Sequence, residues 1–226
     1  MPVDLAGLLA GTALPGGRPQ REPGRFPAAV VTMELQRGVV GDLSSFPELA
    51  QAATEARVVA HTARLLAAAR PAGVPVVHCT AEFRADRRGT VANTPLHTAV
   101  LRRPEHLLEG TPATELTPGL GPTAGDLVSS RRHGVSPFIG TTLDATLRNL
   151  GADVLVVTGV SVNLGVFGLC VEAVNLGYQV ALVTDAVCGL PADYAAEVVR
   201  RSLALVATLA TVDEVAGVLT NGPAPR

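Results

Sequence analysis

Four polar residues stand at or just after the ends of apolar runs, where chemistry could take place: Glu34, His78, Arg132 and Ser161. Ligands of an open parallel sheet bind beyond the carboxyl ends of its strands, so strands that end at these residues would bring them together. A carboxyl group there can donate or accept a proton, whereas a guanidinium stays protonated and can only stabilise an anion. The set predicts proton-transfer chemistry on a small, anionic molecule.

Short β-branched runs alternate with longer runs rich in Ala and Leu. That alternation predicts parallel strands joined by crossover helices. Strands are expected near Ala28–Met33, Val74–His78, Asp126–Ser130, Val154–Thr158, Val180–Thr184 and Ala207–Thr211. Helices are expected near Pro47–Ala69, Thr142–Leu150, Asn163–Asn175 and Ala192–Leu205, with Leu101–Pro122 as a loop region over the site.

The composition indicates one α/β domain. With 226 residues, 47% of them hydrophobic, the chain can bury a substantial core. A net charge of −2 argues against a nucleic-acid partner, and no run is typical of a signal peptide or membrane span. We expect a loosely ordered N-terminal arm over residues 1–27, a domain over 28–218 and a C-terminal tail over 219–226.

Three cysteines, Cys79, Cys170 and Cys188, show no spacing typical of a metal site. They predict a reducing compartment, the cytoplasm, rather than a disulfide framework. Cys170 lies five residues after Gly165 on one predicted helix, about 140° around its axis at ~100° per residue, and is expected in the core. We expect neither a metal nor another cofactor.

Three motifs resemble the isochorismatase-like (cysteine hydrolase) superfamily, whose pattern places a nucleophilic Cys six residues after a strand-ending Gly. The longest motif runs over residues 159–189, GVSVNLGVFGLCVEAVNLGYQVALVTDAVCG. Its family spacing is kept by Gly159, Gly177, Tyr178, Asp185 and Ala186. Gly165 occupies the Cys position.

Two shorter motifs carry the same resemblance. The segment Ala28–Gly38, AAVVTMELQRG, places Glu34 on the family's acid and Gln36 on its Gln. The segment Arg132–Leu143, RHGVSPFIGTTL, places Arg132 on the family's lysine. The chain contains no Lys, so general drift toward Arg explains Arg132 as well as selection does.

The resemblance implies a three-layer αβα fold with an open, mostly parallel, six-stranded sheet, which is Rossmann-like. It implies a cis peptide at Val160-Ser161 and a homo-oligomer, a dimer or tetramer. The catalytic positions would be Glu34, Arg132 and Gly165. Substrate contacts are expected from Gln36, His78, Arg84, Phe138, Val160 and Ser161. His78 could equally be a structural histidine, and Arg84 could form a solvated ion pair.

Gly165 decides which chemistry is expected, because no side chain remains there to form a covalent intermediate. True isochorismatases resemble this chain in having Gly at that position, and they hydrolyse a vinyl ether by acid catalysis. Glu34 could supply the acid and Arg132 the cation for a substrate carboxylate. Two alternatives stay open: a non-catalytic protein that keeps the fold as a binding or assembly module, and an amidase-type hydrolase with a non-standard triad.

Overall fold

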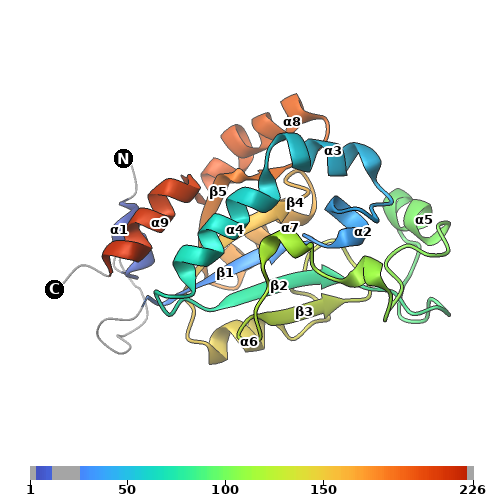
Figure 1. Ribbon diagram of the computed structural model, residues 1–226, viewed down its shortest axis with the longest axis horizontal. Helices are drawn as coiled ribbons and strands as arrows, with labels where there is room; N and C mark the ends of the chain where they lie inside the picture. Colours follow the sequence, from blue (N-terminus) through green and yellow to red (C-terminus); the bar gives the residue numbers. More distant parts are fainter. Residues whose placement is uncertain (1–3, 12–25, 223–226) are drawn as a thin grey trace.

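Six strands form one parallel sheet in the order β3-β2-β1-β4-β5-β6. They are β1 (Ala28–Met33), β2 (Val76–Ala81), β3 (Leu127–Arg131), β4 (Val154–Val160), β5 (Gln179–Cys188) and β6 (Thr208–Ala210). This computed structural model describes residues 4–11 and 26–222, and Figure 1 shows the sheet between its helices. The strand order reverses between β1 and β4, so the ligand crevice is expected at their carboxyl ends.

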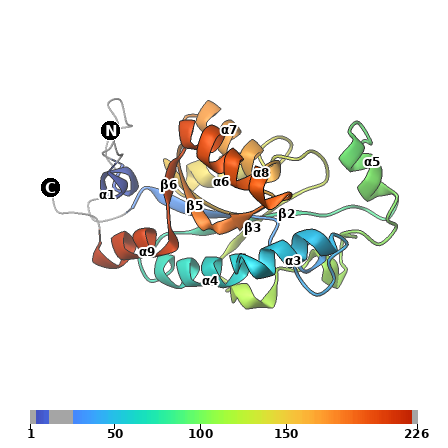
Figure 2. The ribbon, with the colours of Figure 1, turned by 90° about the horizontal axis from the view of Figure 1, so that it is seen from above.

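Helices cover both faces of the sheet, which confirms the three-layer αβα prediction (Figure 2). One layer contains α3 (Pro47–Glu55), α4 (Val58–Ala69) and α9 (Val212–Asn221), and α1 (Leu5–Leu9) packs beside α9. The other contains α6 (Leu143–Asn149), α7 (Gly165–Asn175) and α8 (Ala192–Glu197). Along β1, Val31 and Met33 pack into the core under α7, whereas Ala28 and Val30 pack into the opposite core. Burial on both faces explains the continuous hydrophobicity of these strands.

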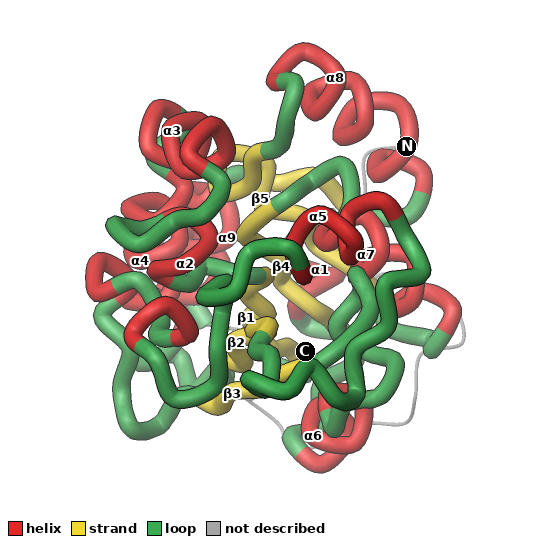
Figure 3. Tube along the Cα trace, turned by 90° about the vertical axis from the view of Figure 1, so that its right-hand side faces the viewer, coloured by secondary structure: helices red, strands yellow, loops and turns green. Residues whose placement is uncertain are grey.

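Two short helices lie outside these layers. They are α2 (Arg37–Val40), which follows β1, and α5 (Pro95–Leu101), which precedes an irregular segment. Figure 3 shows α5 in front of the sheet in the view onto the carboxyl ends of the strands. The segment predicted as a loop over residues 101–122 is indeed mostly irregular, with 3-10 turns at Pro112–Thr114 and Pro118–Leu120.

The structure differs from the sequence prediction at several helix boundaries. The helix expected over 47–69 breaks at Arg57, which adopts a left-handed conformation with φ 54° and separates α3 from α4. The helix expected over 192–205 continues past α8 as a π-helical turn, Val198–Ser202, and a 3-10 turn, Leu203–Leu205. Strand β2 extends to Ala81, so Cys79 lies within it.

The expected loosely ordered arm is wrong for its first part. Residues Leu5–Leu9 form α1, capped by the Asp4 side chain, and Leu8 and Leu9 are buried in the core beside α9. Residues 12–25 of that arm lie outside the described residues. Helix α9 continues to Asn221, so the predicted tail begins inside a helix, and residues 223–226 also lie outside the described part.

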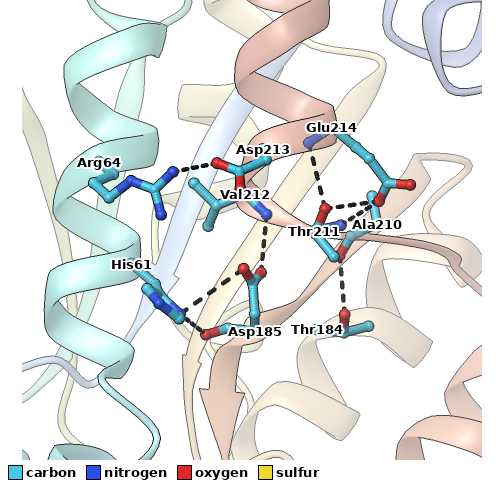
Figure 4. Close-up of polar contacts among 9 residues, drawn as sticks. All are labelled: His61, Arg64, Thr184, Asp185, Ala210, Thr211, Val212, Asp213 and Glu214. Carbon is cyan, nitrogen blue, oxygen red and sulfur yellow. Dashed lines mark hydrogen bonds and ion pairs between the residues drawn. The ribbon is translucent and has the colours of Figure 1, made fainter.

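Asp185, one of the motif residues, lies in β5 and contacts α4 and α9 (Figure 4). Its carboxylate accepts a hydrogen bond of 2.9 Å from the Val212 N–H at the start of α9. His61 of α4 lies against Asp185, with 3.8 Å between Nδ1 and Oδ2, and Arg64 forms an ion pair with Asp213. The motif aspartate therefore supports the fold rather than the cavity described below. None of the described helices is long and apolar enough to span a membrane.

Candidate active site

Glu34 stands directly after β1 and turns the chain away from the sheet. Its φ is 51°, a conformation that few residues other than glycine adopt, and its N–H donates to the Cys79 carbonyl at 2.8 Å. Unusual backbone conformations of this kind often mark functional positions. The side chain is 19% exposed and lines a cavity at the carboxyl edge of the sheet.

Arg131, the last residue of β3, is the cation beside Glu34. Its Nη2 donates to Glu34 Oε1, and its Nε donates to the Gly134 carbonyl at 3.0 Å. The side chain is only 7% exposed. Its Nη1 is buried, and no described residue accepts a hydrogen bond from it. A buried donor without a partner costs about 1–3 kcal/mol, so this site retains a capacity to bind an acceptor.

Arg132, the cation expected from the sequence, lies elsewhere. Its side chain is 41% exposed and donates to Glu109 at 3.0 Å, away from Glu34. Successive residues of a strand point to opposite sides, so only one of the two arginines can face the cavity. The predicted strand ended at Ser130, one residue short of the observed β3, and Arg132 was expected at the site because the motif places it on the family's lysine.

The third catalytic position, Gly165, begins α7 and lines the same cavity. A Cβ added there would approach the Cε of Met33 at 2.8 Å, a contact with the end of a flexible side chain. At the start of this helix the N–H groups of Leu164 and Val166 both donate to the Ser161 carbonyl. The Val160-Ser161 peptide is cis, as the resemblance implies.

Ser161 lines the cavity, and its hydroxyl donates to the side-chain oxygen of Asn163. The amide of Asn163 donates in turn to the Leu190 carbonyl at 3.0 Å. Asn163 also lines the cavity and was not among the residues expected there. Gly159 supports this corner, because a Cβ there would overlap the backbone of Met33 on the neighbouring strand.

Two predicted substrate contacts are buried structural residues instead. The Gln36 amide donates to the carbonyls of Ala81 and Thr114, at 2.9 Å each, and accepts from the Ala81 N–H at 2.8 Å. His78 is fully buried between Thr32, at 2.8 Å from Nδ1, and Asp126, at 3.5 Å from Nε2. Burial lowers the pKa of His78, and Asp126 offsets this only in part. Neither residue lines the cavity.

Three further predicted contacts also lie away from the cavity lining. Arg84 forms a two-point ion pair with Asp86, both distances being 2.9 Å, at the surface. Phe138 is buried in the core against Tyr178, with ring centroids 6.1 Å apart. Val160 is buried and forms the cis peptide with Ser161. Of the six expected substrate contacts, only Ser161 reaches the cavity.

The cavity itself has a volume of about 460 Å³. Its polar end is formed by Glu34, Arg131, Ser161, Asn163 and Gly165. The other walls are largely apolar, with Phe46, Phe83, Leu96, Val100, Leu107, Leu164 and Leu190 among the residues that form them. Glu48, His97 and Arg103 also line it, so a few polar groups stand in a largely apolar cavity, which is the usual form of a small-molecule site.

The cysteines are not placed for catalysis. Cys79 and Cys170 are buried, and burial raises the pKa of each thiol to about 12. Burial likewise raises the pKa of the half-buried Cys188 to about 11. None of the three lines the cavity. Within residues 4–11 and 26–222, no group of three His, Cys, Asp or Glu side chains could hold a metal ion.

A family model described as the isochorismatase domain matches residues 28–214. The structure superposes on an isochorismatase family protein from Burkholderia thailandensis with a TM-score of 0.71 and 28% identity, over 87% of this chain and 98% of that one. The isochorismatase family protein YwoC of Bacillus subtilis is 40% identical over 72 residues, 32% of this chain and 38% of YwoC.

Another relative is the ureidoacrylate amidohydrolase RutB of Methylobacterium radiotolerans. It is 32% identical over 137 residues, which are 51% of this chain and 47% of RutB. The matches to YwoC and RutB therefore span less than half of those relatives. The match of the isochorismatase model to most of the chain shows that the protein belongs to the isochorismatase family.

Proposed function

We propose that the protein hydrolyses a small carboxylate substrate by proton transfer from Glu34 and attack of water, with no covalent intermediate on the chain. Arg131, rather than Arg132, binds the substrate carboxylate. The reaction that fits best is acid-catalysed hydrolysis of a vinyl ether. Gly165, which we assign to the nucleophile position of the family, leaves room at the reacting atoms and supplies no attacking group.

The observation that carries this proposal is the pairing of Glu34 with Arg131 at the polar end of the cavity. One titratable group and one permanent cation meet there, and the Nη1 of that cation has no described partner. A carboxylate is the acceptor that suits a guanidinium best. The site thus offers a place for a substrate anion directly beside a proton donor.

The reaction proceeds in steps that the chain can support. A substrate carboxylate binds Arg131 beside the Glu34 carboxyl, which acts as the acid in this scheme. Glu34 then gives its proton to the vinyl carbon, which leaves an oxocarbenium ion. Water adds to that ion and loses a proton to Glu34, and the hemiketal collapses to a keto acid and an alcohol.

A second candidate is hydrolysis of an amide, favoured by the likeness to the amidohydrolase RutB. In that case Glu34, which lies beside Arg131, would accept a proton from water as the water attacks the amide carbon. The two candidates share Glu34 and Arg131 but release different products.

Product analysis separates the candidates. The purified protein is incubated with isochorismate, and pyruvate is measured by coupled reduction; ureidoacrylate is tested in parallel for release of ammonia. The proposal expects pyruvate and little ammonia. Ammonia without pyruvate would favour the amide reaction, and neither product from these or related substrates would favour a non-catalytic binding module.

We also propose that the protein assembles as a homo-oligomer, a dimer or tetramer, in the cytoplasm. The support is a set of exposed apolar side chains on α7, on α8 and after α8: Val174, Leu176, Tyr194 and Leu205. Such side chains suit contact with a second subunit. Light scattering at micromolar concentration should give a multiple of 23.2 kDa, and a monomer mass would contradict the assembly.

A further inference from the structure

Two histidines, His97 and His106, line the cavity, and neither takes part in the proposed reaction. His106 packs against the Phe46 and Phe83 rings, and burial lowers its pKa to about 4. Its ring is thus an uncharged part of the apolar wall. His97 differs from it, because its neighbours include the segment that follows β3 and contacts Arg131.

His97 belongs to α5, where it and Val100 are the buried residues. It is only 4% exposed, and its Nδ1 lies 3.0 Å from the Thr94 hydroxyl and 3.1 Å from the Asn93 side-chain oxygen. The ring stacks on His133, with centroids 4.8 Å apart and an interplanar angle of 28°. Aromatic pairs stabilise a contact beyond the area that they bury, so this stack joins α5 to the segment after β3.

Two hydrogen bonds join the same two segments. The Thr90 hydroxyl donates to the Arg132 carbonyl at 2.6 Å. The Val91 N–H donates to His133 Nδ1 at 3.3 Å, so the proton of the neutral His133 ring lies on Nε2. Together with the stack, these contacts hold residues 132–134 against residues 90–97.

The stack suits two uncharged rings. Burial lowers the pKa of His97, and the nearby Gly134 carbonyl offsets this in part. The charges of a protonated His133 and of Arg131 lower that pKa further. His97 is therefore uncharged at neutral pH, and no like-charge repulsion opposes its contact with His133.

The segment that His97 contacts also holds Arg131. The Gly134 carbonyl accepts from Arg131 Nε at 3.0 Å, and Glu34 accepts from Nη2. A guanidinium is planar and its donors point in fixed directions, so these two contacts also fix the direction of Nη1, the buried donor without a described partner. Gly134 lies outside the described helices and strands, so neighbouring side chains, rather than a ladder of backbone hydrogen bonds, must keep its carbonyl in place.

We infer that His97 is a positioning residue for Arg131: its stack on His133 holds the segment 132–134 so that the Gly134 carbonyl keeps the guanidinium in one orientation. The inference rests on the proposed function only for the group that binds to Arg131. It gives α5 a role in the affinity for a substrate carboxylate, although α5 contributes no charged residue to the site.

Hydrogen exchange of the Arg131 Nε–H with water tests the inference directly, by NMR on the isotope-labelled full chain. His97→Ala removes the stacked ring and should speed this exchange roughly tenfold, because the hydrogen bond to Gly134 then opens more often. The Nε–H of Arg70, which donates to Asp126 at 3.1 Å outside the cavity lining, is the internal control and should keep its rate. An unchanged rate for Arg131, or an equal increase for both arginines, would overturn the inference.

Three further variants locate the effect. His133→Ala removes the other ring of the stack, at a half-buried loop position, and should speed the Arg131 exchange as His97→Ala does. His97→Phe keeps a ring that can stack and should stay within about twofold of the wild type. His61→Ala removes a histidine that contacts Asp185 instead, and should leave the Arg131 rate unchanged. Wild-type exchange in His133→Ala, or fast exchange in His97→Phe, would contradict the role of the stack.

Turnover gives a second readout that separates this inference from the proposed function. In an active protein His97→Ala should raise KM for isochorismate roughly tenfold and leave kcat within about twofold, because a misaligned Arg131 weakens binding. A lower kcat with an unchanged KM would contradict positioning of the cation. A protein that hydrolyses nothing would lose the proposed function, and the exchange rates of Arg131 would still decide the role of His97.

Discussion

Glu34 and Arg131 lie 97 residues apart in the sequence and form an ion pair across the end of β2, which separates their strands in the sheet. Arg131 is almost completely buried and Glu34 is 19% exposed. Loss of one partner would leave the other charge unpaired in a shielded place, which is strongly unfavourable. The pair therefore places a carboxyl group and a guanidinium side by side at the cavity.

Substitution of the two neighbouring arginines distinguishes the one in the cavity from the one outside it. Arg131→Gln should lower kcat/KM at least roughly 100-fold, because it removes the cation for the substrate carboxylate. Arg132→Gln, the matched control, should stay within about twofold of the wild type, since exposed ion pairs contribute little. Steady-state kinetics on both variants provide the measurement. A large loss in Arg132→Gln with an active Arg131→Gln would restore the assignment made from the sequence.

Gln36 is predicted to matter for stability. Gln36→Leu removes three hydrogen bonds and leaves the buried backbone groups of Ala81 without their partner, so the free energy of unfolding should fall by about 3 kcal/mol. Gln51→Leu removes one exposed contact, with Glu55, and should change it by less than about 0.5 kcal/mol. Urea denaturation compares the two variants. An equally stable Gln36→Leu protein with impaired substrate binding would favour the role predicted from the sequence.

Stability should depend on pH through His106. Its pKa falls from 6.5 to about 4 in the folded protein, so the unfolded chain binds the proton more readily between these values. The contribution of the neutral ring is complete above about pH 6.5 and is lost as pH falls toward 4, a change of roughly 3 kcal/mol. Urea denaturation at pH 7 and pH 4 should show a smaller decline for His106→Asn than for the wild type. Parallel declines would contradict this assignment.

The sequence predicts the sheet well because burial on both faces leaves a clear pattern. Runs such as Ala28–Met33 are almost entirely hydrophobic, and the structure confirms the three-layer fold. The break at Arg57 was missed because its left-handed conformation has no signal in an Arg-Val context. Propensity alone does not report such turns.

The sequence predicts the site only in part, and the wrong assignments have a common physical origin. Glu34, Ser161 and Gly165 line the cavity because they follow strand ends, which a sequence can show. Whether a polar side chain at a strand end faces the cavity depends on register by a single residue. That dependence separates Arg131 from Arg132. It also explains Gln36 and His78, whose side chains are satisfied inside the protein.

The most direct test of the account is the rate of pyruvate release from isochorismate by Glu34→Gln. The substitution keeps the size of the side chain and removes its ability to transfer a proton, so kcat should fall roughly 10²–10⁴-fold. Circular dichroism and the unfolding midpoint of the variant establish that the fold is kept. A kcat within about tenfold of the wild type would show that Glu34 is not the proton-transferring group and would contradict the proposed mechanism.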